Sequence, residues 1–334
     1  MKRNMDEWKD QVIANPVKQP LPILSFPAVK LMGISVQELI SDSKTQAQAM
    51  RIISERNISL AAVSMMDLSL EAEAFGAEIR VADDEVPTVI GSLVKTAQDA
   101  ENLSVPQVGA GRTQIYVDAV RYAVELIQDR PVFAGIIGPF TLAGRLFGLT
   151  QILKATKKNP EMVHVVLEKC NRFLIDYIEA YKNVGANGVL MAEPLTGLLS
   201  PALAEKFSEP YVKEIVDQVQ EPSFMVMYHN CGDNALLMID SILRVGAKGY
   251  HFGNVISMPE AVKKCPRDVL CLGNLDPGIF VYSTRDQIVE KTIQMIEASE
   301  APNYIPSSGC DIPPVAQWDN IDAFYEATSS FYGK

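Results

Sequence analysis

Three residues in this chain are of the types and spacing that hold a metal ion: His229, Cys231 and Cys310. His229 and Cys231 form a His-x-Cys pair at the end of the apolar run MVMYHNC, and the run YIPSSGC ends at Cys310, 79 positions after Cys231. One imidazole and two thiolates are what zinc takes from a protein when its fourth position stays open for a substrate. A closed structural site would need a fourth ligand in a second paired motif, and the sequence offers none. The residues therefore predict a catalytic zinc site, although an isolated Cys at a strand end is otherwise commonly a small buried side chain.

The ligands need elements that bring them together, and the sequence contains eight short apolar runs rich in β-forming residues. Amphipathic helical patterns separate most of these runs, which are too apolar to alternate, as is typical of parallel strands buried on both faces. The predicted fold class is therefore α/β, a single (β/α)8 TIM-type barrel. The eight runs are Leu21–Phe26, Leu60–Asp67, Val132–Pro139, Ala186–Pro194, Ser223–Cys231, Lys248–Asn254, Val269–Pro277 and Tyr304–Cys310.

The limits of the barrel also follow from the sequence. We expect residues 1–20 to form an N-terminal arm or cap and residues 21–334 to form one barrel domain, because no linker rich in Gly, Ser or Pro divides the chain. The interval from Asp67 to Val132 is too long for one helix, so we expect an insertion after the second strand. Within it, VADDEVPTVIGSL (residues 81–93) has the pattern of a small hairpin.

Further polar residues end the apolar runs. Glu193 ends the fourth run, His251 lies in the sixth and Asp276 ends the seventh. Because the carboxyl ends of barrel strands meet at one mouth that holds the active site, we predict that all three are catalytic residues beside the metal. For Glu193 the alternative is an ion pair at the mouth, and for Asp276 it is a turn cap, since Asp before Pro is common in turns.

Composition excludes several kinds of partner. The net charge is −11 and the acidic residues are spread along the chain, whereas nucleic acids and anionic membranes need clustered Lys and Arg. The N-terminal MKRNMDEWKD is too charged for a signal peptide, and the most apolar stretch is too short and too broken by Pro and Gly to span a bilayer. Five cysteines, an odd number, are typical of reduced thiols. We therefore predict a cytoplasmic protein with no nucleic-acid or membrane partner.

Three motifs carry a resemblance to a known family. HNCG (residues 229–232), GNLDP (273–277) and SSGCDIPP (307–314) resemble the uroporphyrinogen decarboxylase superfamily, and in particular its zinc branch, the methylcobalamin:coenzyme M methyltransferases. MDLSLEAEAFGAEI (66–79), GPFTLAG (138–144) and MAEPLTGLLSP (191–201) extend the resemblance along nearly the whole chain. It implies that His229, Cys231 and Cys310 bind zinc and that a methyl group passes from a corrinoid to a small thiol. The chain lacks the Asp-x-His-x-x-Gly pattern of a cobalamin module, so the methylcorrinoid would be a co-substrate on a separate corrinoid-binding protein.

The sequence leaves other functions open. The related methyltransferases tend to place an acidic residue at the end of the sixth strand, where this chain has GYHFGN with His251. That departure leaves room for the reverse transfer, in which a methoxylated or N-methylated compound is demethylated and a corrinoid protein is methylated. A decarboxylase of tetra-acidic tetrapyrroles is disfavoured because the N-terminal segment LPILSFPAVKLMG has no arginine and only Lys30. A non-enzymatic barrel that uses zinc to present a surface to a partner is the remaining alternative.

Overall fold

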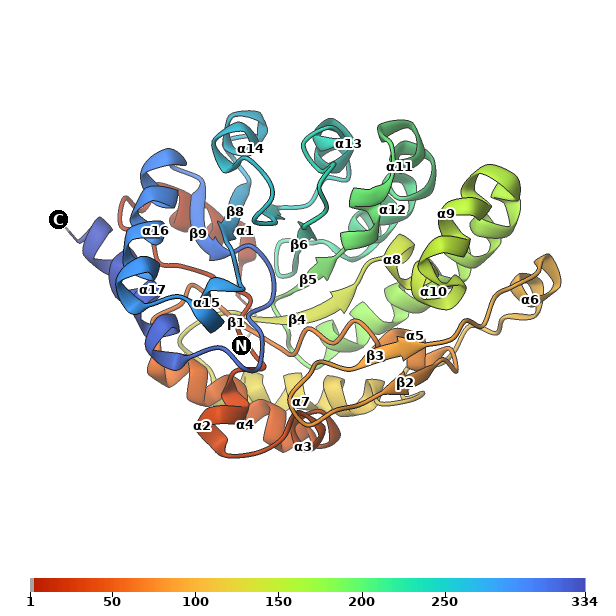
Figure 1. The fold of residues 1–334 in the computed structure, drawn as a ribbon, viewed down its shortest axis with the longest axis horizontal. Helices are drawn as coiled ribbons and strands as arrows, with labels where there is room; N and C mark the ends of the chain where they lie inside the picture. The colour runs from red at the N-terminus through yellow and green to blue at the C-terminus, as the bar shows by residue number, and fades with distance from the viewer. Residues whose placement is uncertain (1–2, 334) are drawn as a thin grey trace.

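A computed structural model describes residues 3–333, which are built around one curled parallel sheet with helices on its outside (Figure 1). All neighbouring strands of this sheet are parallel and follow the order β1-β4-β5-β6-β7-β8-β9. These strands are β1 (Ala62–Val63), β4 (Val132–Ile137), β5 (Gly188–Ala192), β6 (Met225–Asn230), β7 (Gly249–Phe252), β8 (Leu270–Leu275) and β9 (Tyr304–Ser308). They account for seven of the eight predicted runs.

The predicted first strand, Leu21–Phe26, is not a strand, so the expected count of eight is wrong for the described residues. The segment is extended and lies between the two edges of the sheet, where Leu21 N donates to Pro306 O of β9 (3.0 Å) and Leu60 N, just before β1, donates to Pro20 O (3.0 Å). Ile23 N donates to the side chain of Ser308 rather than to a backbone carbonyl (3.0 Å). Prolines at 20, 22 and 27 lack the N–H that a regular ladder needs, which explains why the segment bridges the edges without becoming a strand. We call residues 20–23 the seam.

Helices cover the outer face of the sheet, because each carries an apolar stripe. In the longest helix, α10, the buried residues recur at three- and four-residue spacing from Val163 to Tyr181. The helices are α1 (Met5–Ala14), α2 (Ala28–Met32), α3 (Val36–Ser41), α4 (Ser43–Arg56), α5 (Leu70–Ala74), α6 (Ala97–Asn102), α7 (Thr113–Leu126), α8 (Pro139–Phe147), α9 (Leu149–Lys158), α10 (Pro160–Asn183), the 3-10 helix η1 (Pro194–Leu198), α11 (Pro201–Phe207), α12 (Glu209–Val219), α13 (Ile239–Arg244), α14 (Met258–Lys264), α15 (Ile279–Tyr282), α16 (Arg285–Ala298) and α17 (Trp318–Tyr332).

The strands divide the core into an outer and an inner layer. Alternate residues of β6, Tyr228 among them, pack outward against the helices, whereas Met225 and Met227 belong to a smaller cluster inside the sheet with Phe133, Leu272 and others. Because side chains alternate between the faces of a strand, His229 continues the inward series of Met225 and Met227. The same alternation puts Ser307 of β9 on the inward face with Ile305.

Two additions flank the sheet. Helix α1 contacts the chain just before the strands begin, since Met5 N donates to Pro222 O (2.6 Å) and the Lys9 ammonium donates to Asp268 O. After β1, the predicted hairpin is present as antiparallel β2 (Glu78–Arg80) and β3 (Thr88–Ile90). Helix α1 packs against the sheet that follows it. The predicted division into an N-terminal arm (residues 1–20) and a barrel domain (residues 21–334) remains a prediction.

Candidate metal centre

The structure brings the three predicted metal ligands together. His229 ends the inward series of β6, Cys231 follows that strand directly, and Cys310 lies two residues beyond β9. The potential ligand atoms of these three residues lie within 4.8 Å of one another. The ligand atoms of a tetrahedral zinc site are roughly 3.5–4 Å apart, as its bond lengths require, so small side-chain adjustments are enough to close the site.

Local backbone geometry positions Cys231 at the end of β6. Asn230 Oδ1 accepts from Gly232 N (3.0 Å), which turns the chain immediately after β6 and holds Cys231 at the end of the sheet. Gly253 faces Cys231 so closely that a Cβ atom at residue 253 would come within 2.5 Å of the Cys231 Cα and Cβ atoms. Only glycine leaves that space, so the glycine after the β7 strand is part of what positions the thiol.

A chain of hydrogen bonds fixes the orientation of the His229 ring. Ser307 Oγ donates to the carbonyl of Leu21 in the seam (2.6 Å), so it accepts from His251 Nε2 (2.8 Å). His251 Nδ1 is then an acceptor for His229 Nδ1–H (2.7 Å), and the carbonyl of His251, also only an acceptor, lies 3.3 Å from the same His229 nitrogen. His229 Nε2 consequently carries the free lone pair. We call Leu21, Ser307 and His251 the relay behind His229.

His229 Nε2 has the properties expected of a metal-ligand atom. This nitrogen is buried and has no hydrogen-bond partner among residues 3–333. An unpaired buried acceptor costs free energy, which coordination of a cation would recover. The donor set of one imidazole nitrogen and two sulfurs suits zinc, so these residues fit the ion that the sequence predicts.

The pKa values of the two thiols are shifted in opposite directions. The hydrogen bond between them lowers the pKa of Cys231 and raises the pKa of Cys310 to about 12, because one proton is shared between two sulfurs. Neighbouring thiolates repel each other, so both lose their protons only when a cation balances their charge.

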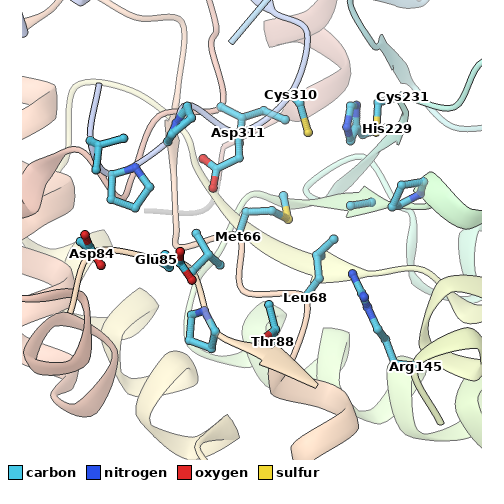
Figure 2. A pocket seen from close by; sticks show the side chains of 18 residues that line it. Met66, Leu68, Asp84, Glu85, Thr88, Arg145, His229, Cys231, Cys310 and Asp311 are labelled. Carbon is cyan, nitrogen blue, oxygen red and sulfur yellow. The ribbon is translucent and has the colours of Figure 1, made fainter. Parts of the chain in front are cut away.

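A cavity of about 560 Å³ opens directly onto the three ligands. Figure 2 shows Cys310, Cys231 and His229 gathered at one end of it. Its walls come from segments that follow strands, and they include the β2–β3 hairpin. Apolar residues form most of the lining, among them Ile23, Met66, Leu68, Pro194, Pro313 and Val315. The cavity therefore lies at the carboxyl end of the sheet, as expected for an active site on this kind of fold.

None of the three predicted catalytic residues lines the cavity. His251 is fully buried behind His229, on the side away from the cavity lining. Asp276 caps a turn, where Oδ1 accepts from Gly278 N (2.9 Å), and it does not line the cavity. Glu193 is also fully buried and contributes nothing to the lining. A catalytic role for each of them stays a prediction.

The Glu193 carboxylate accepts hydrogen bonds from the first turn of helix α8. It accepts from Phe140 N (2.7 Å), Thr141 N (3.0 Å), Thr141 Oγ1 (2.6 Å) and Thr196 Oγ1 (3.2 Å). Burial raises the pKa of this carboxyl group to about 7, and these hydrogen bonds oppose the rise. The helix N-terminus favours the negative charge, so Glu193 joins β5 to α8 rather than pairing with a cation as one alternative had it.

Glu193→Gln should therefore destabilise the fold. Both oxygens of Glu193 accept hydrogen bonds, and the amide nitrogen of Gln would face a donor in place of one of them. We expect a loss of about 1–3 kcal/mol in the free energy of unfolding, measured by urea denaturation. Glu179→Gln on α10, where the carboxylate makes only a partly exposed pair with Lys182, is the control. Unchanged stability of Glu193→Gln together with a loss of activity would instead favour a catalytic Glu193.

Sequence reasoning missed three residues of the site. Ser307 holds His251, Asp311 lines the cavity with a buried Oδ1 that has no hydrogen-bond partner in residues 3–333, and Arg145 of α8 lines the cavity as well. Burial raises the pKa of Asp311 well above its usual range. Ser307 and Asp311 lie close to Cys310 in SSGCD, and Arg145 is the one charged residue in the apolar run GPFTLAGRLFG (138–148), so both places offered a usable clue.

Known proteins with similar sequences include two kinds of enzyme. The family described as uroporphyrinogen decarboxylase (URO-D) matches residues 17–331. The methylcobamide:CoM methyltransferase MtbA of Methanosarcina acetivorans is 26% identical over 272 residues, covering 79% of this chain and 78% of that protein. A uroporphyrinogen decarboxylase of Coxiella burnetii is 26% identical over 281 residues, covering 81% of this chain and 77% of the other.

Solved structures show the same fold. A methyltransferase from Methanosarcina mazei superposes with a TM-score of 0.86 at 20% identity, covering 99% of this chain and 98% of that one. A B12-independent methionine synthase from Shewanella sp. W3-18-1 superposes with a TM-score of 0.59 at 11% identity, covering 95% and 96% of the two chains. Among residues 3–333, no helix has the length and apolar character needed to cross a membrane. The chain belongs to the uroporphyrinogen decarboxylase family, as the resemblance of its motifs predicts.

Proposed function

We propose that this protein is a zinc-dependent methyltransferase that moves a methyl group from a methylated corrinoid, carried by a separate protein, to a small thiol. The observation that carries the proposal is His229 Nε2, which has no hydrogen-bond partner among the described residues and lies near two cysteine sulfurs at the end of an apolar cavity. The similarity to methylcobamide:CoM methyltransferases supports it.

The residues of the chain divide the work of this reaction. His229, Cys231 and Cys310 would hold zinc, which in such a site lowers the pKa of an added thiol so that the thiol reacts as a thiolate. The two cysteine sulfurs add negative charge around the acceptor and keep it nucleophilic. The apolar walls exclude water from the acceptor and line it up with the incoming methyl group.

The transfer balances without a further reactant. The acceptor thiol loses its proton to solvent, and its sulfur forms a new bond to the methyl carbon. The cobalt–carbon bond breaks and both of its electrons stay with cobalt, so methyl-Co(III) becomes Co(I). No oxidant or reductant is consumed.

Exposed apolar side chains at the carboxyl end of the sheet suit docking of a protein that delivers the corrinoid. Exposed apolar side chains follow five consecutive strands: Leu198 after β5, Leu237 after β6, Val255 after β7, Tyr282 after β8 and Val315 after β9. These positions share the carboxyl end of the sheet with the metal ligands. Exposed apolar residues grouped in this way mark interaction surfaces, and we assign this one to the corrinoid-binding protein.

A tetrapyrrole decarboxylase fits the cavity less well, although the family includes such enzymes. Among the described residues that line the cavity, Arg145 is the only Arg or Lys, and Asp84, Glu85 and Asp311 are acidic. A substrate with several carboxylates would meet little positive charge there.

The proposal is tested by anaerobic assay of the zinc-loaded protein with methylcobalamin and 2-mercaptoethanol. We expect the methyl–cobalt absorbance to disappear and S-methylated thiol to form in equal amount, and prior removal of zinc with a chelator should stop both. Loss of methyl from a methoxylated or N-methylated compound to cob(I)alamin, without transfer to thiols, would establish the reverse direction instead. Decarboxylation of uroporphyrinogen by the zinc-free protein would overturn the proposal.

A further inference from the structure

Asp311 lines the cavity beside the candidate metal centre, and one of its carboxyl oxygens has no partner. It follows Cys310 directly, and Figure 2 shows its carboxyl group pointing into the cavity. Its Oδ1 atom is buried and has no hydrogen-bond partner in residues 3–333. Arg145, the one Arg or Lys among the described lining residues, lies on the other side of the cavity in the same view. The cavity therefore contains a hydrogen-bonding oxygen that the fold does not use.

Another buried aspartate shows how this chain satisfies such a group when its role is structural. Asp67 Oδ1 accepts from the backbone N (3.0 Å) and the hydroxyl (2.6 Å) of Ser69. Asp67 Oδ2 accepts from Arg112 Nη1 (2.7 Å) and from Tyr116 OH (3.0 Å). Proteins rarely bury a polar oxygen without a partner, because its desolvation is then not compensated. Asp311 Oδ1 lacks such partners, which indicates that its partner arrives with a substrate.

The segment that contains Asp311 runs from the metal ligands to the edge of the cavity. It begins at the candidate ligand Cys310, continues along the lining and ends at the exposed Val315. In the proposed reaction the acceptor sulfur approaches the methyl carbon from the side opposite cobalt, so the methyl-bearing face of the corrin ring is turned towards the metal ligands. A corrin ring in that position lies close to residues 311–315.

The methyl-bearing face of a corrin carries groups that complement a carboxyl group. Acetamide side chains of the ring project from that face, and each ends in a primary amide with two N–H donors beside a carbonyl acceptor. A carboxylate accepts from the N–H groups, and a protonated carboxyl group also donates to the carbonyl, so the pairing does not depend on the charge of Asp311. Asp84 and Glu85, exposed on the same side of the cavity in Figure 2, add further acceptors.

We propose that Asp311 binds a side-chain amide of the corrin ring and so places the methyl-bearing face of the donor over the acceptor. This inference rests on the proposed function. It divides the cavity between the two substrates, because the metal ligands hold the acceptor thiol and Asp311 recognises the methyl donor. Corrinoids with intact side-chain amides are then the preferred donors.

The binding experiment compares two methyl–cobalt corrinoids that both lack the nucleotide. The side chains of methylcobinamide end in amides, whereas those of methylated cobyrinic acid heptamethyl ester end in esters without N–H groups. Equilibrium dialysis of the zinc-loaded protein without thiol, in one methanol–buffer mixture, measures binding in the absence of methyl transfer. Asp311→Leu should weaken methylcobinamide about 10-fold and leave the ester nearly unchanged, as expected for the loss of one hydrogen-bonded contact. Asp311→Asn keeps a carbonyl acceptor and should restore part of the affinity.

Asp217→Leu is the control for this experiment. Asp217 lies on α12 outside the cavity and pairs with Lys213, so its removal should leave the ratio of the two affinities unchanged. The zinc content of each protein is measured alongside. Loss of zinc from Asp311→Leu with an unchanged affinity ratio would make Asp311 a support of the metal centre and would overturn the inference.

The remaining outcomes separate this inference from the proposed function. An unchanged affinity ratio in fully zinc-loaded Asp311→Leu would overturn the role of Asp311 while methyl transfer to thiols stands. Binding of neither corrinoid to wild type would overturn the proposed methyl donor, and this inference with it. The alternative hydrogen-bond donor is a hydroxyl group of the acceptor. If Asp311→Leu raises the KM for 2-mercaptoethanol but not for ethanethiol, the assignment to the corrin is wrong.

Discussion

Cys310→Ser should yield a protein that retains its fold, purifies without zinc and no longer transfers methyl groups. Cys310 is one of the three proposed ligands, and of these three it alone follows β9, whereas the other two lie at the end of β6. A serine oxygen is a poor replacement for a thiolate on zinc. We expect about one zinc per chain in wild type and less than roughly a tenth of that in the variant. Methyl transfer should fall more than about 100-fold, beyond the range for changes that only alter the hydrogen bonds of a ligand.

The control for this experiment is Cys265→Ser. Cys265 is a buried free thiol that follows α14 and is not among the candidate ligands, so its removal should leave the zinc content unchanged. Elemental analysis of both variants, purified without oxygen, gives the result directly. Full zinc content in Cys310→Ser would show that Cys310 does not bind the metal, and the proposed centre shared by β6 and β9 would be wrong.

Ser307→Ala should weaken zinc binding although Ser307 touches neither zinc nor a thiol. Its hydroxyl is the acceptor for His251 Nε2, and without it His251 loses the contact that keeps its Nδ1 an acceptor for His229. His229 is then free to turn or to place its proton on Nε2, the atom that faces the cysteines. Loss of such support for a ligand typically costs 10- to 100-fold in metal affinity, and we expect a decrease of about that size.

A competing chelator dye measures this affinity independently of catalysis. Thr292→Ala is the control, since Thr292 of α16 is also fully buried and its Oγ1 donates to Ile288 O of the same helix (2.7 Å) rather than to the relay or the seam. It should cost some stability and leave zinc affinity close to that of wild type. Equal zinc affinities in all three proteins would mean that the relay does not position His229.

The metal ligands were predictable from the sequence because their chemistry is carried by residue type and by position at strand ends. His229, Cys231 and Cys310 could be assigned to one mouth as soon as the parallel strands were recognised. Their supports were not predictable in the same way. His251 was predicted to be catalytic from its place in the sixth run, but the in-register pairing of β6 with β7 puts it behind His229, and register does not show in the sequence.

The wrong strand count and the surroundings of Glu193, which the sequence did not show, have related physical causes. The run Leu21–Phe26 is apolar enough for a strand, but Pro22 within it and the flanking Pro20 and Pro27 leave too few N–H groups for a ladder. Glu193 ends its run as predicted, yet the carboxylate meets the start of α8, which packs beside β5 only in three dimensions. Arg145 was missed because its distinguishing feature is that no acidic side chain among the described residues pairs with it. A sequence does not show which counter-charges are out of reach.

The relay also ties the metal centre to the place where the sheet closes. Leu21 belongs to the seam between β9 and Leu60, and its carbonyl is the end of the chain of hydrogen bonds that begins at His229. In the proposed zinc protein, metal affinity and the closure of the seam are therefore expected to be thermodynamically linked. If local opening of the seam lowers the metal affinity by some factor, binding of the metal lowers the opening equilibrium constant of the seam by the same factor. Binding of the proposed ion is thus expected to change how often the proline-rich segment between β9 and Leu60 opens, although this segment is not itself a strand.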